Sequence, residues 1–299
     1  MATTKVHPER IRNGSRSDAA DPITAYLRGQ VDQLHATDMA VRLREPDGIH
    51  DMRVTVRRLR GTLRTFRKAL GRHDALGAEL KWLSGVLGAA RDAEVLHRHL
   101  TKQIDATPSE LVLGPVRAQL ERQLSRPTAD AGAAVLTALE SGRYLALLDT
   151  VDRLVDTGRP IPERALPKLV GKAYRKAERA MRAAERATDR DAALHEVRKA
   201  ARRLRYACEA VAPLVGKPAR RTRKRAKRVQ DVLGRHHDLV SLRAPLRDAG
   251  VQAHLDGANG FTFGLLHGRA VELARQAEAE FPPAWRRLAR PKATRWMRR

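Results

Sequence analysis

Residues 49–60 read IHDMRVTVRRLR, a short segment that is dense in basic side chains. At the 100 degrees per residue of an α-helix, these cations and those of the next turn fall within a sector of roughly 80 degrees. An apolar set falls about 100 degrees away and is wide enough to bury against other helices. The segment therefore predicts a helix over residues 49–70 with a core face and a cationic stripe, which consists of His50, Arg53, Arg57, Arg60 and Arg64.

This stripe is long as well as basic. At a rise of 1.5 Å per residue it extends roughly 21 Å, which suits an extended anion better than a single carboxylate. The alternative interpretation is an ordinary solvated helix face. Features elsewhere in the sequence are needed to distinguish these two interpretations.

The composition favours a polyanionic partner. The chain has 299 residues, 42% of them hydrophobic, and a formal charge of +25 from 59 Lys and Arg against 34 Asp and Glu. Nucleic acid, an anionic membrane surface and inorganic phosphate polymers are the partners that such an imbalance suggests, rather than a neutral metabolite. The polar N-terminal region lacks the apolar run of a signal peptide, and no stretch approaches the eighteen or so apolar residues of a membrane span. With a single cysteine, Cys208, we expect a buried thiol in a cytoplasmic protein without membrane insertion.

Apolar residues recur at helical spacing nearly throughout, whereas alternating strand-like runs are hard to find. We therefore predict an all-α fold, with the Pro-rich segment around residues 157–167 as a connector near the middle. The expected helices cover residues 23–43, 49–70, 76–87, 92–104, 111–124, 131–155, 165–187, 192–214, 220–233, 238–248 and 260–280.

The opening segment recurs within the chain. HDMRVTVRRLR at residues 50–60 returns 145 positions later as HEVRKAARRLR at residues 195–205, with six of eleven positions identical. A duplication retained only for packing would preserve core residues while its exposed face drifted. Here the basic stripe agrees best, so we expect two stripes that face a common anion, the second formed by His195, Arg198, Arg202 and Arg205.

A second pair of blocks extends the repeat. LKWLSGVLGAARDAEVL at residues 80–96 matches AKRVQDVLGRHHDLVSL at residues 226–242. Gly88 and Gly234 are conserved between the blocks and predict helix ends. Asp92 and Asp238 follow them, and we expect these to cap a helix or pair with an arginine.

These four blocks resemble the two halves of a CHAD domain, and the resemblance covers nearly the whole chain from about residue 21 to residue 280. It implies two helical bundles of about four or more helices each, related by a pseudo-twofold axis around a basic central cavity that binds inorganic polyphosphate, often at polyphosphate granules. It also implies cavity roles for both stripes, with Lys81 in the first half and Lys227 in the second. Two departures from the repeat are Arg64, which is matched by Glu209, and Arg91, which is matched by His237. The expected boundaries are a polar tail at 1–20, halves at 21–156 and 165–281, a linker at 157–164 and a basic tail at 282–299.

Further cations are candidates for the cavity wall. Arg175, Arg179 and Arg182 share one face of the helix before the second stripe. The run RRTRKRAKR at residues 220–228 surrounds its helix, so only part of it can face one ligand, and we include Lys224 and Arg228 as neighbours of Lys227.

Two other functions remain open. A binder of phosphate groups in nucleic acid is the first alternative, although aromatic residues are only 4% of the chain and single-strand binders usually interleave them with charge. A phosphohydrolase is the second, although the basic helices bring no carboxylate cluster for Mg²⁺. The histidine pairs at 97/99 and 236/237 lack the spacing of a helical zinc site and are interpreted as surface residues. We therefore expect polyphosphate binding without catalysis, metal or cofactor, in a cytoplasmic protein at polyphosphate granules.

Overall fold

The computed structural model describes residues 22–156 and 161–297. The predicted tail at 1–20 and residues 157–160 of the predicted linker lie outside the described residues. Within the two described ranges the chain forms helices and no strand, which confirms the all-α prediction. None of these helices is both long enough and apolar enough to cross a membrane. The α-helices are α1 (Pro22–Arg42), α2 (Gly48–Leu70), α3 (Asp74–Asp105), α4 (Val116–Glu140), α5 (Gly142–Asp156), α6 (Leu166–Ala184), α7 (Arg190–Ala210), α8 (Ala212–Val215), α9 (Lys217–Leu255), α10 (Phe261–Ala279), α11 (Phe281–Ala289) and α12 (Pro291–Thr294).

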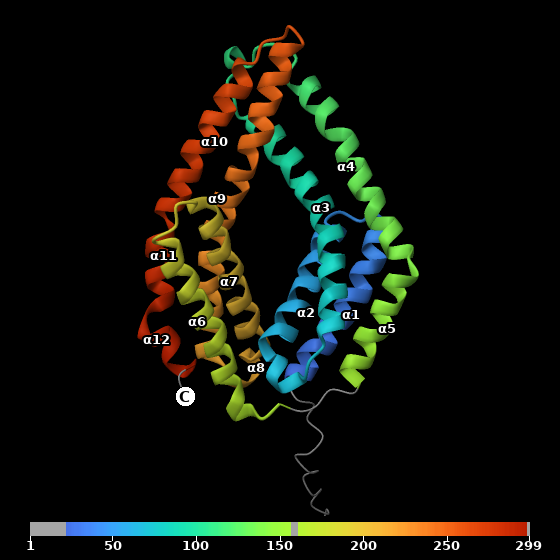
Figure 1. Cartoon of the computed structure of the whole chain (residues 1–299), viewed down its shortest axis with the longest axis vertical. Helices are drawn as coiled ribbons and strands as arrows, with labels where there is room; N and C mark the ends of the chain where they lie inside the picture. The colour runs from blue at the N-terminus through green and yellow to red at the C-terminus, as the bar shows by residue number, and fades with distance from the viewer. Residues whose placement is uncertain (1–21, 157–160, 298–299) are drawn as a thin grey trace, which may run out of the picture.

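The two halves of the chain lie side by side and meet at two places (Figure 1). Helices α1–α5 form one side and α6–α12 the other, with α2 and α7 facing each other at the broad end. At the narrow end the long helices α3 and α9 converge with α4 and α10. A separate apolar cluster holds that end together, and it includes Leu100, Ile104, Leu120, Leu246 and Phe263. This arrangement is consistent with one bundle from each repeat.

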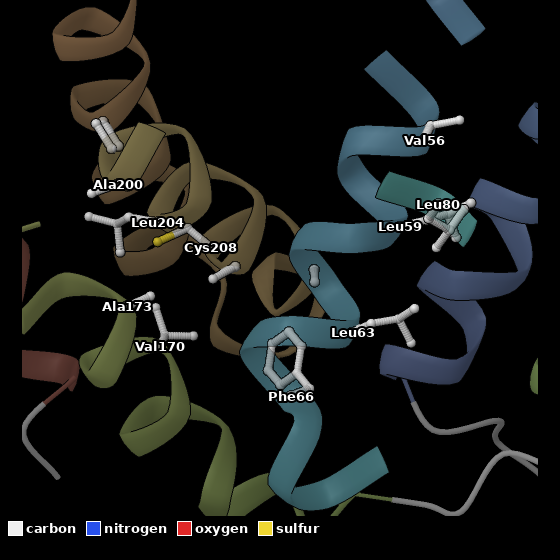
Figure 2. Packing of buried hydrophobic residues seen from close by; sticks show 14 of the residues in the cluster. Val56, Leu59, Leu63, Phe66, Leu80, Val170, Ala173, Ala200, Leu204 and Cys208 are labelled. Atoms are coloured by element: carbon white, nitrogen blue, oxygen red, sulfur yellow. The ribbon is translucent and has the colours of Figure 1, made fainter. Parts of the chain in front are cut away.

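Helix α2 follows its predicted amphipathic pattern. Met52, Val56, Leu59, Leu63 and Phe66 are all buried, and each fully buried side chain of this size contributes about 1.5–3 kcal/mol. In Figure 2, Val56, Leu59 and Leu63 lie toward Leu80 of α3, while Leu204 of α7 lies toward Val170 and Ala173 of α6. Cys208 is buried in the same core, as predicted. The apolar faces of α2 and α7 therefore pack into their own halves, and this leaves their basic faces free to line the space between the halves.

The prediction that Gly88 and Gly234 end helices was wrong. Helix α3 continues through Gly88 and α9 continues through Gly234. A helical glycine costs only about 0.5–1 kcal/mol relative to alanine, which tertiary packing readily offsets. Both glycines are instead places of close approach: a Cβ on Gly88 would lie 3.6 Å from Arg53 Nη2, and one on Gly234 would lie 3.6 Å from Arg198 Nε.

The C-terminal region is also part of the fold, contrary to the predicted tail at 282–299. Phe281, Trp285, Leu288 and Met297 are buried in the main core. The segment is anchored on α9, because Thr222 donates a hydrogen bond to the Ala293 carbonyl at 2.6 Å. Its high content of Arg and Pro concealed apolar residues at a helical spacing of three and four positions. Two smaller corrections concern residues 131–155, which divide at Ser141 into α4 and α5, and residues 111–115, which precede α4.

Candidate functional site

A cleft of about 940 Å³ lies between α2, α3, α7 and α9. We call it the central cleft. Both predicted stripes contribute to its wall, so the structure brings the two repeats together on one space. The predicted residues that line it are His50, Arg53, Arg57, Arg60, His195, Arg198 and Arg202.

The arginines deepest in the central cleft have no counter-charge. Arg57 and Arg202 make no ion pair with any described residue, and the buried Nε atoms of Arg57 and Arg198 have no hydrogen-bond partner in that part of the chain. Burial lowers the pKa of all three guanidinium groups, and the charge of Arg57 lowers the pKa of Arg202 further. An anion in this cleft would thus meet donors that the protein itself leaves unsatisfied.

Two aspartates that line the central cleft partly offset the positive charge of its arginines. Arg53 Nη1 donates to Asp92 Oδ1 at 3.0 Å, which confirms the expected pairing with an arginine, although neither aspartate caps a helix. Asp238 lies near Arg198, and burial raises the pKa of its carboxyl group while the arginine opposes that change. Each aspartate follows a glycine on which the arginine packs, so this part of the cleft repeats the same construction in both halves.

The histidines at the start of each stripe are largely uncharged near neutral pH. Burial is the main cause that lowers the pKa of His50 and His195, and nearby arginines add to it. His195 Nδ1 lies 3.2 Å from His237 Nδ1. Burial and then the charge of His195 lower the pKa of His237 to about 4. The central cleft therefore contains imidazoles that an incoming negative charge would protonate.

The basic lining continues beyond the central cleft along α2. Arg60 also lines a cleft of about 420 Å³, together with Arg64 and Lys176. That cleft shares Arg64 and Lys176 with a third one of about 280 Å³, which lies between α2, α6 and α7. We call these two clefts the side groove. Its remaining basic residues are Arg67, Lys68, Lys172, Arg175, Arg179 and Arg203, with His73 at one end.

Six predicted residues lie outside the central cleft and the side groove. Lys227 pairs with Asp231 at 2.7 Å, and Arg228 donates to Glu280 at 2.8 Å. The guanidinium group of Arg205 lies over the ring of Tyr206, 4.7 Å from its centroid. The other three are exposed side chains, namely Lys81, Arg182 and Lys224.

Several lining residues were not predicted from the sequence. Arg91, Arg98, His99 and His237 line the central cleft, and Arg203 lines the side groove. The identity of Arg58 and Arg203 within the repeat was a signal for the last of these, but its role could not be separated from packing. Arg91 is held by Asp47 at 3.2 Å and Glu94 at 2.9 Å, so its charge is largely neutralised within the protein.

One histidine of each predicted pair has an acidic partner. His97 pairs with Glu121 at 2.9 Å, and His236 lies 3.2 Å from Asp191. The interpretation of His236 as a surface residue was wrong, because only 3% of it is exposed. Among residues 22–156 and 161–297, no group of three or more His, Cys, Asp or Glu side chains is placed to hold a metal ion.

Comparison with known proteins places this architecture among related ones. The family model of the CHAD domain matches residues 25–247. Two uncharacterized proteins of Mycobacterium tuberculosis are each 36% identical over 291 residues: MT2285 of strain CDC 1551 / Oshkosh and Rv2226 of strain ATCC 25618 / H37Rv. The alignments cover 94% of this chain and 55% of each relative, so the chain spans about half the length of the curated relatives it matches.

Two solved structures share the fold. PptA from Streptomyces chartreusis superimposes with a TM-score of 0.71 and 26% identity, over 89% of this chain and 98% of that one. The CHAD domain from the plant Ricinus communis gives a TM-score of 0.71 and 25% identity, over 94% of this chain and 96% of that one.

Proposed function

We propose that this chain, which belongs to the CHAD domain family, binds inorganic polyphosphate in its central cleft. CHAD domains are in general linked to polyphosphate binding and are binding rather than catalytic domains. The observation that carries the proposal is the set of half-buried arginines from both repeats that face one cleft, of which Arg57 and Arg202 form no ion pair with a described residue.

The chemistry of polyphosphate fits this lining. The polymer is a flexible string of negatively charged oxygens, and guanidinium groups can donate two parallel hydrogen bonds to them. It has no bases, so its binder needs no stacking platform. Entry of the polymer would supply acceptors for the unpaired Nε atoms and would relieve the repulsion between Arg57 and Arg202. Binding therefore gains from removing an unfavourable state of the free protein as well as from new contacts.

We also propose that the protein binds the polymer without cleaving it and accumulates where polyphosphate is stored. Because the chain spans only about half of its curated relatives, any activity of a longer protein lies outside this proposal. A fluorescent fusion should coincide with polyphosphate granules, and the Arg57→Ala, Arg202→Ala double variant should not. Incubation with the parent protein should leave the length distribution of the polymer unchanged on a gel.

Competition between polyanions tests the proposed ligand. Long-chain polyphosphate, duplex DNA and single-stranded RNA are titrated against the protein over one series of salt concentrations. All three affinities fall with salt through counterion release, so the rank order at matched salt is the informative quantity. Polyphosphate should bind most tightly. Equal or tighter binding of either nucleic acid would make the protein a nucleic-acid binder instead.

A further inference from the structure

The side groove lies on one side of the paired helices α2 and α7, next to the second half of the chain. It opens from the central cleft at Arg60, which lines both spaces. Helix α7 contributes Arg203 to it, and α6 contributes four cations, namely Lys172, Arg175, Lys176 and Arg179. No described carboxylate forms an ion pair with these residues, and burial followed by the charge of Arg203 lowers the pKa of Lys176. Asp74 is the one acidic residue that lines the groove, and it pairs with Arg72 at 2.6 Å. The groove is therefore a strongly basic extension of the central cleft.

The repeat shows what occupies the equivalent place on the other side. Helices α1 and α6 align best through their buried positions: Ile23, Leu27, Val31, Leu34 and Val41 correspond to Leu166, Val170, Tyr174, Ala177 and Ala184. In this alignment the positions of α1 that are equivalent to the cations of α6 carry no basic residue. Lys172, Arg175, Lys176 and Arg179 correspond to Gly29, Asp32, Gln33 and Ala36.

The helices α2 and α7 also differ in charge at equivalent positions, again with more positive charge on the side of the groove. Arg203 is equivalent to Arg58, and Arg64 is equivalent to Glu209. Arg58 Nε lies 3.2 Å from Glu209 Oε1, so the charge is neutralised there. On the side of the groove the equivalent pair is Arg203 and Arg64, two cations. Burial and then the charge of Arg64 lower the pKa of Arg203.

A tyrosine completes the difference. The hydroxyl of Tyr26 on α1 donates to Glu209 Oε1 at 3.2 Å. In the register of the buried positions Tyr26 corresponds to Leu169, which lines the side groove. A bulky side chain and an ion pair thus occupy the first side, whereas a smaller side chain and two like charges border an open groove on the second.

We propose that polyphosphate leaves the central cleft on one side only, through the side groove between α2 and α6. The inference rests on the proposed function and adds a path and a length requirement to it. A long chain contacts both the central cleft and the groove, whereas inorganic triphosphate is satisfied by the central cleft alone. The duplicated fold therefore holds its ligand asymmetrically.

Two equivalent arginines provide the sharpest comparison. Arg203→Gln should lower the affinity for long-chain polyphosphate about tenfold, because it removes a charged hydrogen-bond donor from the path. Arg58→Gln should change that affinity by no more than about twofold, as expected for a residue off the path. Thermal unfolding is recorded for both variants, since Arg58→Gln also breaks an ion pair with the partly buried Glu209.

A variant of exposed residues removes the concern about folding. Replacing Arg175, Lys176 and Arg179 by Gln should lower long-chain affinity and reduce the slope of log affinity against log salt by about 2, by analogy with single-stranded nucleic acid. Triphosphate affinity should stay within about twofold. The matched control replaces Arg122, Arg286 and Arg287, which are equally exposed and lie outside both the central cleft and the groove.

The outcomes separate the inference from the proposed function. If the parent binds no polyphosphate, the proposed function fails and the path fails with it. If the parent binds but Arg58→Gln and Arg203→Gln weaken long-chain binding equally, the chain is held symmetrically and the inference alone is overturned. The same holds if the triple variant behaves like its control, or if it loses triphosphate as strongly as the long chain.

Discussion

Arg57 and Arg202 are half-buried and form no ion pair with a described carboxylate, and burial lowers the pKa of both guanidinium groups. Such an arrangement costs free energy in the unliganded protein because burial disfavours the charged form. A side chain that serves only stability is not expected to keep a charge without an ion-pair partner. A side chain that binds an anion is expected to do so. At the scale of single residues, Arg57 and Arg202 are therefore the positions at which we expect an effect on binding without a loss of stability.

Substitution of neighbouring residues on α2 should show this separation. Arg57→Ala should leave the free energy of unfolding unchanged or raise it, because it removes an unpaired, half-buried charge. Leu59→Ala, two positions away, should cost about 2–5 kcal/mol, because Leu59 is fully buried in the core. Denaturant unfolding of the two variants measures both effects. A loss of several kcal/mol in Arg57→Ala would show that the arginine is a structural residue.

The histidines of the central cleft should make polyphosphate affinity depend on pH. Burial lowers the pKa of His50, His195 and His237 in the free protein, and a bound polyanion would raise these pKa values again. Binding should then take up protons, and affinity should increase as pH falls from the ordinary histidine value of about 6.5 toward the lowered values. Besides burial, the charged neighbours that act on the free values are Arg57, Arg91, Arg198, Arg202, Lys199, His195, Asp47, Asp51, Asp92, Glu196 and Asp238.

The same shifts give a sign for stability. A histidine with a lowered pKa in the folded protein binds protons less readily than in the unfolded chain, so the unliganded protein should lose stability as pH falls through about 6.5.

The pH dependence of polyphosphate affinity is measured by titrations between about pH 5.5 and 8, which are compared with those of a His50→Gln, His195→Gln, His237→Gln variant. A slope of log affinity against pH that survives all three substitutions would remove the histidines from the binding mechanism.

At the scale of helices, α3 and α9 form walls of the central cleft as continuous helices without a break at their glycines. Each passes a glycine beneath an arginine of the central cleft, at Gly88 under Arg53 and at Gly234 under Arg198. A local pattern of apolar residues followed by glycine is the same for a helix end and for a point of close approach. The sequence could therefore predict that these segments are helical but could not predict that they are unbroken.

A substitution at Gly88 tests the close approach. Gly88→Val should weaken polyphosphate binding, because the branches beyond its Cβ would occupy the space of the Arg53 guanidinium group, which lies 3.6 Å from the Cβ position. Gly85→Val is the matched control, because it lies on the same helix and its Cβ would meet no atom within 4 Å. Isothermal titration of the two variants makes the comparison. Equal affinities would show that Gly88 has no part in positioning Arg53.

The basic stripes of α2 and α7 were predictable because two copies within one chain preserve the same cation spacing. The helix at residues 220–228 was harder to interpret, since its cations surround the axis and their direction depends on packing. The structure pairs Lys227 with Asp231 and Arg228 with Glu280, so both are turned toward acidic partners. Partners that lie 52 positions apart, such as Arg228 and Glu280, leave no trace in a local pattern.

At the scale of the whole molecule, the two halves contact each other through α2 and α7 and again through the apolar cluster at the narrow end. The central cleft lies between these two contacts, so the fold fixes the distance between the stripes. The C-terminal segment packs against α9 of the second half, and its residues Trp285 and Leu288 belong to the main core. A net charge of +25 can attract any polyanion, but only this fixed geometry can favour one of them.

The role of the central cleft is tested most directly by the affinity of the Arg57→Ala, Arg202→Ala double variant for long-chain polyphosphate. It is measured at matched salt against the parent and against Arg286→Ala, Arg287→Ala, which removes the same charge from an exposed surface of α11. The double variant should bind at least about a hundredfold more weakly, since two charged hydrogen-bond donors are lost, while the control should stay within about twofold of the parent. Equal affinities of the two variants would mean that net charge, and not the central cleft, holds the polymer.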